Sequence, residues 1–551
     1  MFCAGGNGYS AGSAVDAGLT PWSACAVNAR SVQPSAGVAL FGAACIYAAL
    51  RLYGFYHVDE LGQISMFALY KLGIATAADL PWEFAQQMRP WLQPAIYLAV
   101  LKPWIAMFGY DFPTAERLMV VVQLVLLCAA LPLFLRAVPR PAGPACQQAV
   151  YRFGTLALLV TWFVPSMIMR HASEAFAVLW LAIGVGLWQR VEDAEQPRGW
   201  VALGSGLAAG LAFASRYQVG LFVAGFWIAR AVGSRRERRL RSALVWFAGG
   251  VVLSLAVALA VDAWGYGQFT LTPWNYLREN VLFDQASRFG RSPWYFYLLE
   301  ASLLTLNPLF FVWLARAAVV SWREPFARAL VVGLLVFLAV HCAIPHKEVR
   351  FLLPMWPVAV VLLAKMFGTD ALRDSGGAPA AGPGRFGRVW RALFGVGYIR
   401  VVALANLVAL IGFCAFGLVR DRYRSDLVLW ALPPGTTVLS PANLYRTFDD
   451  ALGPPPPPLS YSQSVRRPTY VRLVYAPVPA LAPTCVAQPK ALVLLTNQAP
   501  DPATRALMNR DYSPVVADSP GWAWLEHSAL MQRMWQFKLV SCASFLAAPE
   551  L

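Results

Sequence analysis

The chain has 551 residues, of which 58% are hydrophobic and only 13% charged, and its mean hydropathy is +0.51. This composition excludes a string of ordinary soluble domains and indicates a polytopic α-helical membrane protein. The formal charge of +16 does not predict nucleic-acid binding, because the basic residues lie mostly in short loops between apolar segments, where they set membrane orientation.

In chain order, residues 1–35 are rich in Gly, Ala and Ser and lack a basic segment followed by a long apolar core. They therefore predict a disordered leader. Apolar runs of about 17 to 25 residues then predict a transmembrane domain over residues 36–418 with about eleven spanning helices. The run 93–109 predicts an interfacial or re-entrant helix. The predicted spans are 36–53, 115–135, 153–169, 174–189, 200–215, 217–233, 243–263, 295–315, 328–345, 350–367 and 399–418.

Residues 419–551 contain no apolar run of membrane length and are rich in proline. Short β-like runs such as TTVLS (436–440) and KALVLLTN (490–497) alternate with turn-rich sequence, which predicts a small soluble α/β domain. The nine cysteines show no metal-ligand spacing, and no metal site is predicted. A disulfide between Cys485 and Cys542 is an open alternative, conditional on an oxidising compartment.

With a cytoplasmic N-terminus, every strongly basic loop falls on one side of the membrane, as the positive-inside rule requires. The other side then receives the polar segments that can carry chemistry, together with the region after about residue 419. These polar segments are HVDELGQ (57–63), RHASE (170–174), SRYQ (215–218), the loop 266–295 and PHKEVR (345–350). The sequence therefore predicts a single site on the non-cytoplasmic face.

The candidate acids of the site lie in HVDELGQ and RHASE. Asp59 and Glu60 directly follow the first span, and a partly desolvated carboxylate with a like-charged neighbour gains the proton affinity that a general base needs. A solvated loop start is the alternative interpretation. Arg170 and Glu174 are spaced i, i+4, so a structural ion pair between them is the alternative to a role in the site.

The segment PHKEVR carries three groups that are cationic or can become so: His346, Lys347 and Arg350. With a span ending at Pro345 and the next helix beginning at once, they would lie at a helix N-terminus, which favours phosphate binding. Positive charge on this side opposes the positive-inside rule, so topology does not explain it. In the loop 266–295, Trp274 and Asn275 suit sugar binding, with an interfacial aromatic belt as the alternative.

HKEVRFLLP (346–354) resembles the HKE-x-RF-x-x-P signature of glycosyltransferase family 22, which holds the mannosyltransferases of GPI-anchor and N-glycan precursor assembly. HVDELGQ, LPWEFAQQMRPWLQP (80–94) and YGQFTLTPWNYLRENVL (266–282) resemble further family motifs in the same order. The resemblance covers roughly residues 36–367 and is greatest to the GPI mannosyltransferase III branch. Val58 stands where the family usually has Pro.

The resemblance implies a GT-C fold without cofactor or metal, acting on the lumenal or periplasmic side. It implies inverting transfer of a sugar, mannose above all, from a polyprenyl-phosphate donor to a lipid-linked glycan acceptor. Asp59 is the candidate general base, Glu60 positions the acceptor or replaces Asp59, and His346, Lys347 and Arg350 hold the departing phosphate. Further candidate substrate-binding residues are His57, Gln63, Trp82, Glu83, Arg89, Arg170, Glu174, Trp274 and Asn275.

Two other functions stay open. A transporter or flippase of polyprenyl-linked glycans could use the same groove, although intramembrane charge is sparse and no inverted repeat or pair of broken helices is evident. A noncatalytic assembly subunit is the third reading. Arg outnumbers Lys 39 to 6 and no N-x-S/T sequon occurs, which favours a bacterial inner membrane over the endoplasmic reticulum membrane.

Overall fold

The computed structural model describes residues 36–51, 59–109 except 74, 76, 78 and 79, 112–139, 154–233 except 156 and 160, 238–373, 395–416, 437–440, 472–475, 478–496 and 537–547. The predicted leader, residues 1–35, lies outside the described residues.

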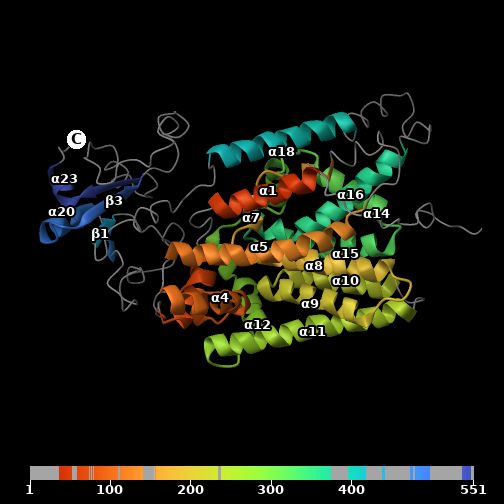
Figure 1. The fold of residues 1–551 in the computed structure, drawn as a ribbon, viewed down its shortest axis with the longest axis horizontal. Helices are drawn as coiled ribbons and strands as arrows, with labels where there is room; N and C mark the ends of the chain where they lie inside the picture. The colour runs from red at the N-terminus through yellow and green to blue at the C-terminus, as the bar shows by residue number, and fades with distance from the viewer. Residues whose placement is uncertain are drawn as a thin grey trace, which may run out of the picture.

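The described part is mostly helical, and its long helices run roughly along one axis (Figure 1). The helices of residues 36–418 are α1 (Ala36–Arg51), α2 (Met66–Lys71), α3 (Trp82–Ala85), α4 (Leu92–Phe108), α5 (Phe112–Ala137), α7 (Val164–Ile168), α8 (Ser173–Asp193), α9 (Gly199–Ser215), α10 (Val219–Gly233), α11 (Arg238–Tyr266), α12 (Thr272–Leu277), α13 (Phe296–Leu304), α14 (Phe310–Ser321), α15 (Pro325–Ala343), α16 (Trp356–Arg373) and α18 (Val396–Phe416). Short π or 3-10 segments are η1 (Glu60–Ser65), η3 (Arg278–Leu282), η4 (Gln285–Phe289) and η5 (Val349–Met355).

Five helical segments of the described residues are long and apolar enough to cross a membrane. They are Thr114–Ala137, Ser173–Asp193, Arg239–Tyr266, Pro325–Ala343 and Val349–Thr369. This agrees with the predicted helical membrane class, while the number of about eleven spans stays a prediction. The run predicted as interfacial or re-entrant forms the single helix α4.

Close backbone contacts hold the helices around α8 together. A Cβ on Gly186 of α8 would clash with the Leu133 carbonyl oxygen of α5, and one on Gly206 of α9 would clash with the Phe247 carbonyl oxygen of α11. Small residues let helices approach this closely, and in a bilayer such packing is a main source of helix association. These close approaches hold α8 against α5 and α9 against α11.

The predicted continuous span 295–315 is wrong, because the structure breaks it into α13 and α14. Pro308 lacks a backbone N–H and cannot sit inside an α-helix without removing a hydrogen bond. Leu306 adopts φ +50°, which a non-glycine residue rarely does. The predicted span 153–169 is interrupted as well, by a turn at Trp162 and Phe163 before α7.

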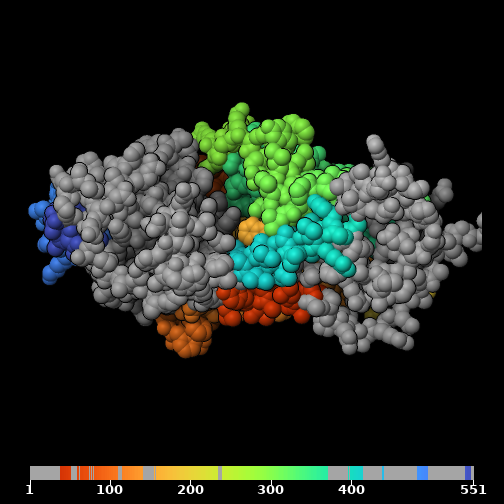
Figure 2. Space-filling model, turned by 90° about the horizontal axis from the view of Figure 1, so that it is seen from above, coloured from red at the N-terminus to blue at the C-terminus, as the bar shows by residue number. Residues whose placement is uncertain are grey.

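The backbone groups that these two helix breaks leave unpaired find hydrogen-bond partners in the surrounding helical bundle. Trp162 donates its ring N–H to the Leu304 carbonyl oxygen at 2.8 Å, and Asn406 of α18 donates to the Thr305 oxygen at 2.9 Å. The Asn406 amide oxygen accepts from the Trp162 backbone at 3.3 Å. The sequence-based expectation that broken helices are absent is therefore wrong. Near these breaks α18 lies against α1 (Figure 2), and Leu410 of α18 packs with Ala44 of α1.

The segment after α15 also differs from its prediction. The next helix was expected to begin at once, but η5 intervenes and α16 begins only at Trp356. Pro354 explains the delay, since it lacks an N–H and its ring clashes with the carbonyl four residues earlier in an α-helix. His346 and Lys347 consequently lie in a loop that precedes a 3-10 turn, and they do not lie at an α-helix N-terminus.

The described C-terminal residues form a four-stranded sheet in the order β2-β1-β3-β4. Strands β1 and β2 and strands β1 and β3 pair in parallel, whereas β3 and β4 are antiparallel. Strands β1 and β3 lie in the runs TTVLS and KALVLLTN. Figure 1 shows this sheet at one end of the helical bundle. The elements are β1 (Thr437–Ser440), β2 (Arg472–Tyr475), α20 (Val478–Ala487), β3 (Leu492–Thr496), β4 (Phe537–Ser541) and α23 (Cys542–Ala547).

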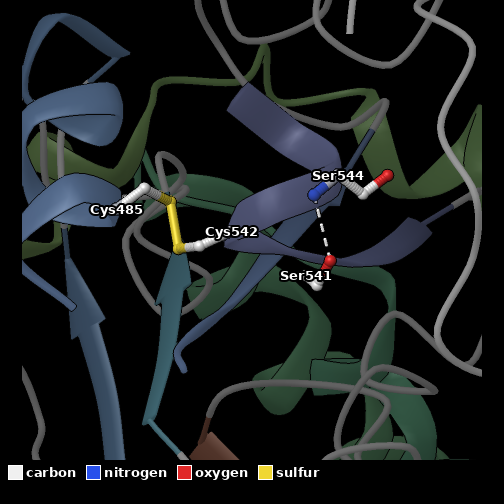
Figure 3. The surroundings of a disulfide bond; sticks show 4 residues. All are labelled: Cys485, Ser541, Cys542 and Ser544. Carbon is white, nitrogen blue, oxygen red and sulfur yellow. Dashed lines mark hydrogen bonds between the residues drawn. A yellow bond between two sulfur atoms is a disulfide. The ribbon is translucent and has the colours of Figure 1, made fainter. Parts of the chain in front are cut away.

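Cys485 of α20 and Cys542 of α23 form a disulfide over a separation of 57 residues (Figure 3). The pairing that the sequence left open is therefore present in the structure. Both cysteines are buried in a small core with Leu439 and Val493. The Ser541 hydroxyl accepts from the Ser544 backbone N–H at 3.0 Å, which caps the first turn of α23. The disulfide thus ties together the two helices that flank the sheet.

Candidate active site

Asp59 and Glu60, the two adjacent acids at the start of η1, lie in different environments. The Asp59 side chain is 22% exposed and that of Glu60 only 1%. Glu60 accepts from Arg170 at 3.1 Å, so it forms a buried charged pair. Of the two acids, Asp59 is the one that remains accessible to solvent. His57, the first residue of the predicted acidic motif, lies outside the described residues.

Arg350 is the residue at which distant segments meet. Its Nη2 donates to Asp59 Oδ2 at 2.6 Å, across 291 positions of sequence, and its Nε donates to Glu348 Oε2 at 2.6 Å. Its Nη1 lies 3.3 Å from Glu174 Oε1. The guanidinium is buried and surrounded by three carboxylates. The acidic and basic motifs therefore face one another directly, as their shared side of the membrane predicted.

Arg170 and Glu174 do not pair with each other, although their i, i+4 spacing allows it. Arg170 contacts Glu60, and Glu174 lies between Arg350 and Arg216, with its Oε1 at 3.2 Å from Arg216 Nη2. The break before α8 explains this difference, because Arg170 precedes the helix that begins at Ser173. Both residues hold charged partners inside the site, and Glu174 is too buried to contact a substrate directly in this arrangement.

The two other candidate phosphate ligands differ in their contacts. His346 Nε2 lies 3.0 Å from Glu348 Oε1. The Lys347 ammonium donates to the carbonyl oxygens of Ser292 and Ile344 at 3.0 and 2.5 Å. Burial lowers the pKa of Lys347. An ammonium has three N–H donors, so two carbonyl contacts leave Lys347 one donor for a phosphate oxygen.

Three further predicted residues form one cluster beside the acids. Glu83 Oε1 accepts from Gln63 at 3.1 Å and from Arg89 at 3.2 Å. Burial raises the pKa of Glu83, and the charge of Asp59 adds to the rise, while Arg89 opposes it. Asp59 thus lies within electrostatic reach of this cluster, which joins the segment 80–94 to the acid motif.

In the loop 266–295 and at Trp82, the described side-chain contacts are with other protein groups. Asn275 donates to the Gln87 carbonyl oxygen at 3.2 Å and to Thr270 Oγ1 at 3.0 Å. Trp82 stacks on Phe289 with ring centroids 6.4 Å apart, and Phe289 in turn lies 5.9 Å from the His346 ring. Trp274 is exposed, and no described contact distinguishes a role in sugar binding from a place in an interfacial belt.

Arg216, His171 and Glu116 were not among the predicted site residues, but they also lie in this cluster. Arg216, from the turn SRYQ, is buried and contacts Glu174. His171 Nε2 lies 2.9 Å from Glu116 Oε2, and the Ser65 hydroxyl donates to Glu116 Oε1 at 3.0 Å. An arginine on the non-cytoplasmic side, as in SRYQ, was the signal that could have found Arg216. Glu116 belongs to an apolar helix, and no sequence signal pairs it with His171.

The His171 and Glu116 pair predicts a pH-dependent stability. Burial disfavours the imidazolium, but the charge of Glu116, its hydrogen bond and the charge of Glu60 outweigh burial and Arg170, so the pKa of His171 is raised above 6.5. A raised pKa means that the pair stabilises the protein fully below pH 6.5 and loses this contribution as pH rises through the folded-state pKa. Thermal unfolding temperature should therefore fall from pH 6 to pH 9. Glu116→Gln should flatten this dependence, and an unchanged slope would contradict the assignment.

Comparisons with known proteins find relatives that are named mannosyltransferases. A fruit fly (Drosophila melanogaster) GPI mannosyltransferase 3 is 30% identical over 131 residues, covering 23% of each chain. A bovine (Bos taurus) GPI alpha-1,2-mannosyltransferase 3 is 26% identical over 291 residues, covering 51% of this chain and 50% of the relative. The first of these alignments spans under a quarter of the relative, and the second about half.

Two solved structures of ArnT from Cupriavidus metallidurans are also similar. The structure bound to undecaprenyl phosphate has a TM-score of 0.46 at 13% identity, and the apo structure 0.48 at 14%, each covering 93% of this chain and 99% of ArnT. The model of the Alg9-like mannosyltransferase family matches residues 39–419, which include every segment of the site. The chain therefore belongs to the Alg9-like mannosyltransferase family.

Proposed function

We propose that this protein is an inverting glycosyltransferase of GT-C fold that moves mannose from a polyprenyl-phosphate donor to a lipid-linked glycan acceptor. The observation that carries the proposal is the contact of 2.6 Å between Asp59 and Arg350. This contact brings the candidate base, Asp59, next to a candidate phosphate ligand, Arg350. The chain also belongs to a family of mannosyltransferases. We further propose that the reaction needs neither a cofactor nor a metal ion.

In the proposed reaction, Asp59 accepts the proton of the acceptor hydroxyl while the hydroxyl oxygen attacks the anomeric carbon of the donor. The bond between that carbon and the phosphate oxygen breaks, and the polyprenyl phosphate leaves with the electron pair. Arg350 and the remaining N–H of Lys347 stabilise the departing phosphate, an effect often worth a few kcal/mol in a water-poor site. His346 orients Glu348, which holds the Nε of Arg350.

The same residues explain how donor and base could be coupled. Arg350 donates to Asp59 in the ligand-free site, so a bound phosphate competes with Asp59 for the guanidinium. When the phosphate takes that N–H, Asp59 loses a stabilising partner and becomes a stronger base. The donor therefore prepares the base for the acceptor.

We place the site on the non-cytoplasmic face of a multi-pass membrane protein. The partition of Arg and Lys among loops supports this side, and the Arg-rich composition favours a bacterial inner membrane, with the endoplasmic reticulum membrane as the alternative. The soluble unit predicted for residues 419–551 would lie on the same side, where an oxidising compartment permits the disulfide between Cys485 and Cys542.

A transfer assay tests the proposal. Purified full-length protein is incubated with radiolabelled polyprenyl-phosphate mannose and a panel of mannose-containing glycolipids, and the label in the glycolipid is measured. We expect covalent transfer with inverted anomeric configuration. Movement of a labelled glycolipid across a vesicle membrane without covalent transfer would instead support a flippase, and neither activity would support an assembly subunit.

A further inference from the structure

A polar pocket lies between the start of α4, the start of α8, the turn SRYQ and α12. It is partly open to solvent. Its lining includes Gln63, Arg89, Gln93, Arg216, Gln218 and Tyr276. Gln63 belongs to η1, the segment that Glu60 opens, so the pocket adjoins the acid motif.

Four polar atoms of these lining residues are buried without a hydrogen-bond partner among the described residues. Two are donors, the Nε–H groups of Arg89 and Arg216, and two are acceptors, the Oε1 atoms of Gln93 and Gln218. Gln93 is 1% and Arg216 is 5% exposed. An unpartnered buried polar atom costs about 1–3 kcal/mol, so four around one pocket call for a ligand that both donates and accepts.

The orientation of these groups is set by their other contacts. Gln93 Nε2 donates to the His171 carbonyl oxygen at 2.6 Å, which leaves Oε1 as its acceptor without a partner. The amide of Gln218 contacts the Tyr276 hydroxyl at 2.5 Å. Arg89 lies over the Tyr276 ring at 5.5 Å. The polar atoms are thus held in place before any ligand binds.

Charge in the pocket wall argues for a neutral ligand. Arg89 pairs with Glu83 at 3.2 Å, and Arg216 pairs with Glu174 at 3.2 Å, so each guanidinium is balanced by a carboxylate. A phosphate offers only acceptors and would leave both glutamine oxygens unsatisfied. A sugar hydroxyl both donates and accepts, and a row of hydroxyls matches two donors and two acceptors.

We propose that this pocket binds the hydroxyl-bearing edge of the acceptor sugar, an inference that rests on the proposed function. The pair of Arg216 and Glu174 separates the pocket from Arg350, where the donor phosphate binds. The acceptor and the donor phosphate therefore enter on different sides of Glu174, with Asp59 in contact with Arg350 and within electrostatic reach of Arg89 in the pocket wall. Gln218 is accordingly an acceptor-specificity residue.

The test uses the full-length chain and the variant Gln218→Ala, with Gln189→Ala as matched control. Gln189 lies near the far end of α8 and bonds Asp193. We expect Gln218→Ala to raise the KM for the glycolipid acceptor about tenfold, the effect of one lost hydrogen bond of about 1.4 kcal/mol, while the donor KM stays within about twofold. A change in donor KM, or no change in either, would overturn the inference.

A binding arm keeps the inference separate from the proposed function. Binding of methyl α-mannoside is measured by saturation-transfer NMR, with inorganic phosphate as competitor. Weaker binding to Gln218→Ala than to the wild type and to Gln189→Ala supports the pocket, even if no transfer is found with any acceptor. Equal binding to all three proteins, or displacement of the mannoside by phosphate, would overturn it.

Discussion

Asp59→Asn should leave a folded protein with mannosyl transfer reduced about a thousandfold, within the range expected for loss of a general base. Asparagine keeps the shape of the side chain and an oxygen that accepts from Arg350, so the contact at 2.6 Å can persist. It cannot take a proton from a hydroxyl. Initial rates of transfer and thermal unfolding in detergent measure the two properties separately.

Asp284→Asn is the matched control for this substitution. Asp284 is an exposed acid whose described partners are Arg291 at 2.8 Å and the Ser287 hydroxyl at 2.5 Å, outside the cluster around Arg350. Its transfer rate should stay within about twofold of the wild type, because exposed ion pairs contribute little. If Asp59→Asn kept more than a tenth of the wild-type rate, Asp59 would not be the base.

Arg350→Ala should abolish transfer and also destabilise the fold. The substitution leaves Asp59, Glu174 and Glu348 close together without the guanidinium that neutralises them. Removing one partner of a buried ion pair costs about 3–5 kcal/mol. We therefore expect a clear fall in thermal unfolding temperature together with loss of activity.

Two companion variants separate charge from geometry. Arg350→Lys restores the charge but cannot contact three carboxylates at once, so stability should recover in part while the donor KM stays raised. Arg291→Ala removes an exposed arginine of the same face and should change neither property. Wild-type stability in Arg350→Ala would show that the three carboxylates are not held by this residue.

The sequence identified the helices and the segments of the site because both have local signals. Hydropathy located the long spans, and counts of basic residues placed the acidic and basic motifs on one face. The pairing inside the site could not be read in this way. The i, i+4 rule links Arg170 to Glu174, whereas the fold links Arg170 to Glu60 and Glu174 to Arg216, which are tertiary contacts between separate elements.

Helix breaks escaped prediction for a related reason. The mean hydropathy of the window 295–315 stays high although the window contains Asn307 and Pro308. The break there is stabilised by Asn406, about a hundred positions later in the chain. Likewise, Pro354, the proline that delays α16, follows the basic motif and lies inside the apolar run 350–367 that predicted a continuous helix. Polar groups freed by such breaks need partners that only the folded bundle supplies.

The most direct measurement is a cryo-EM structure of the full-length protein with bound polyprenyl phosphate. The phosphate should lie within hydrogen-bond distance of Arg350 or Lys347, with Arg350 withdrawn from Asp59 and the acid facing the space beside the phosphate. A phosphate bound at the other end of the bundle would contradict the proposed mechanism. So would a phosphate that lies too far away to contact Arg350 and leaves the contact between Asp59 and Arg350 unchanged.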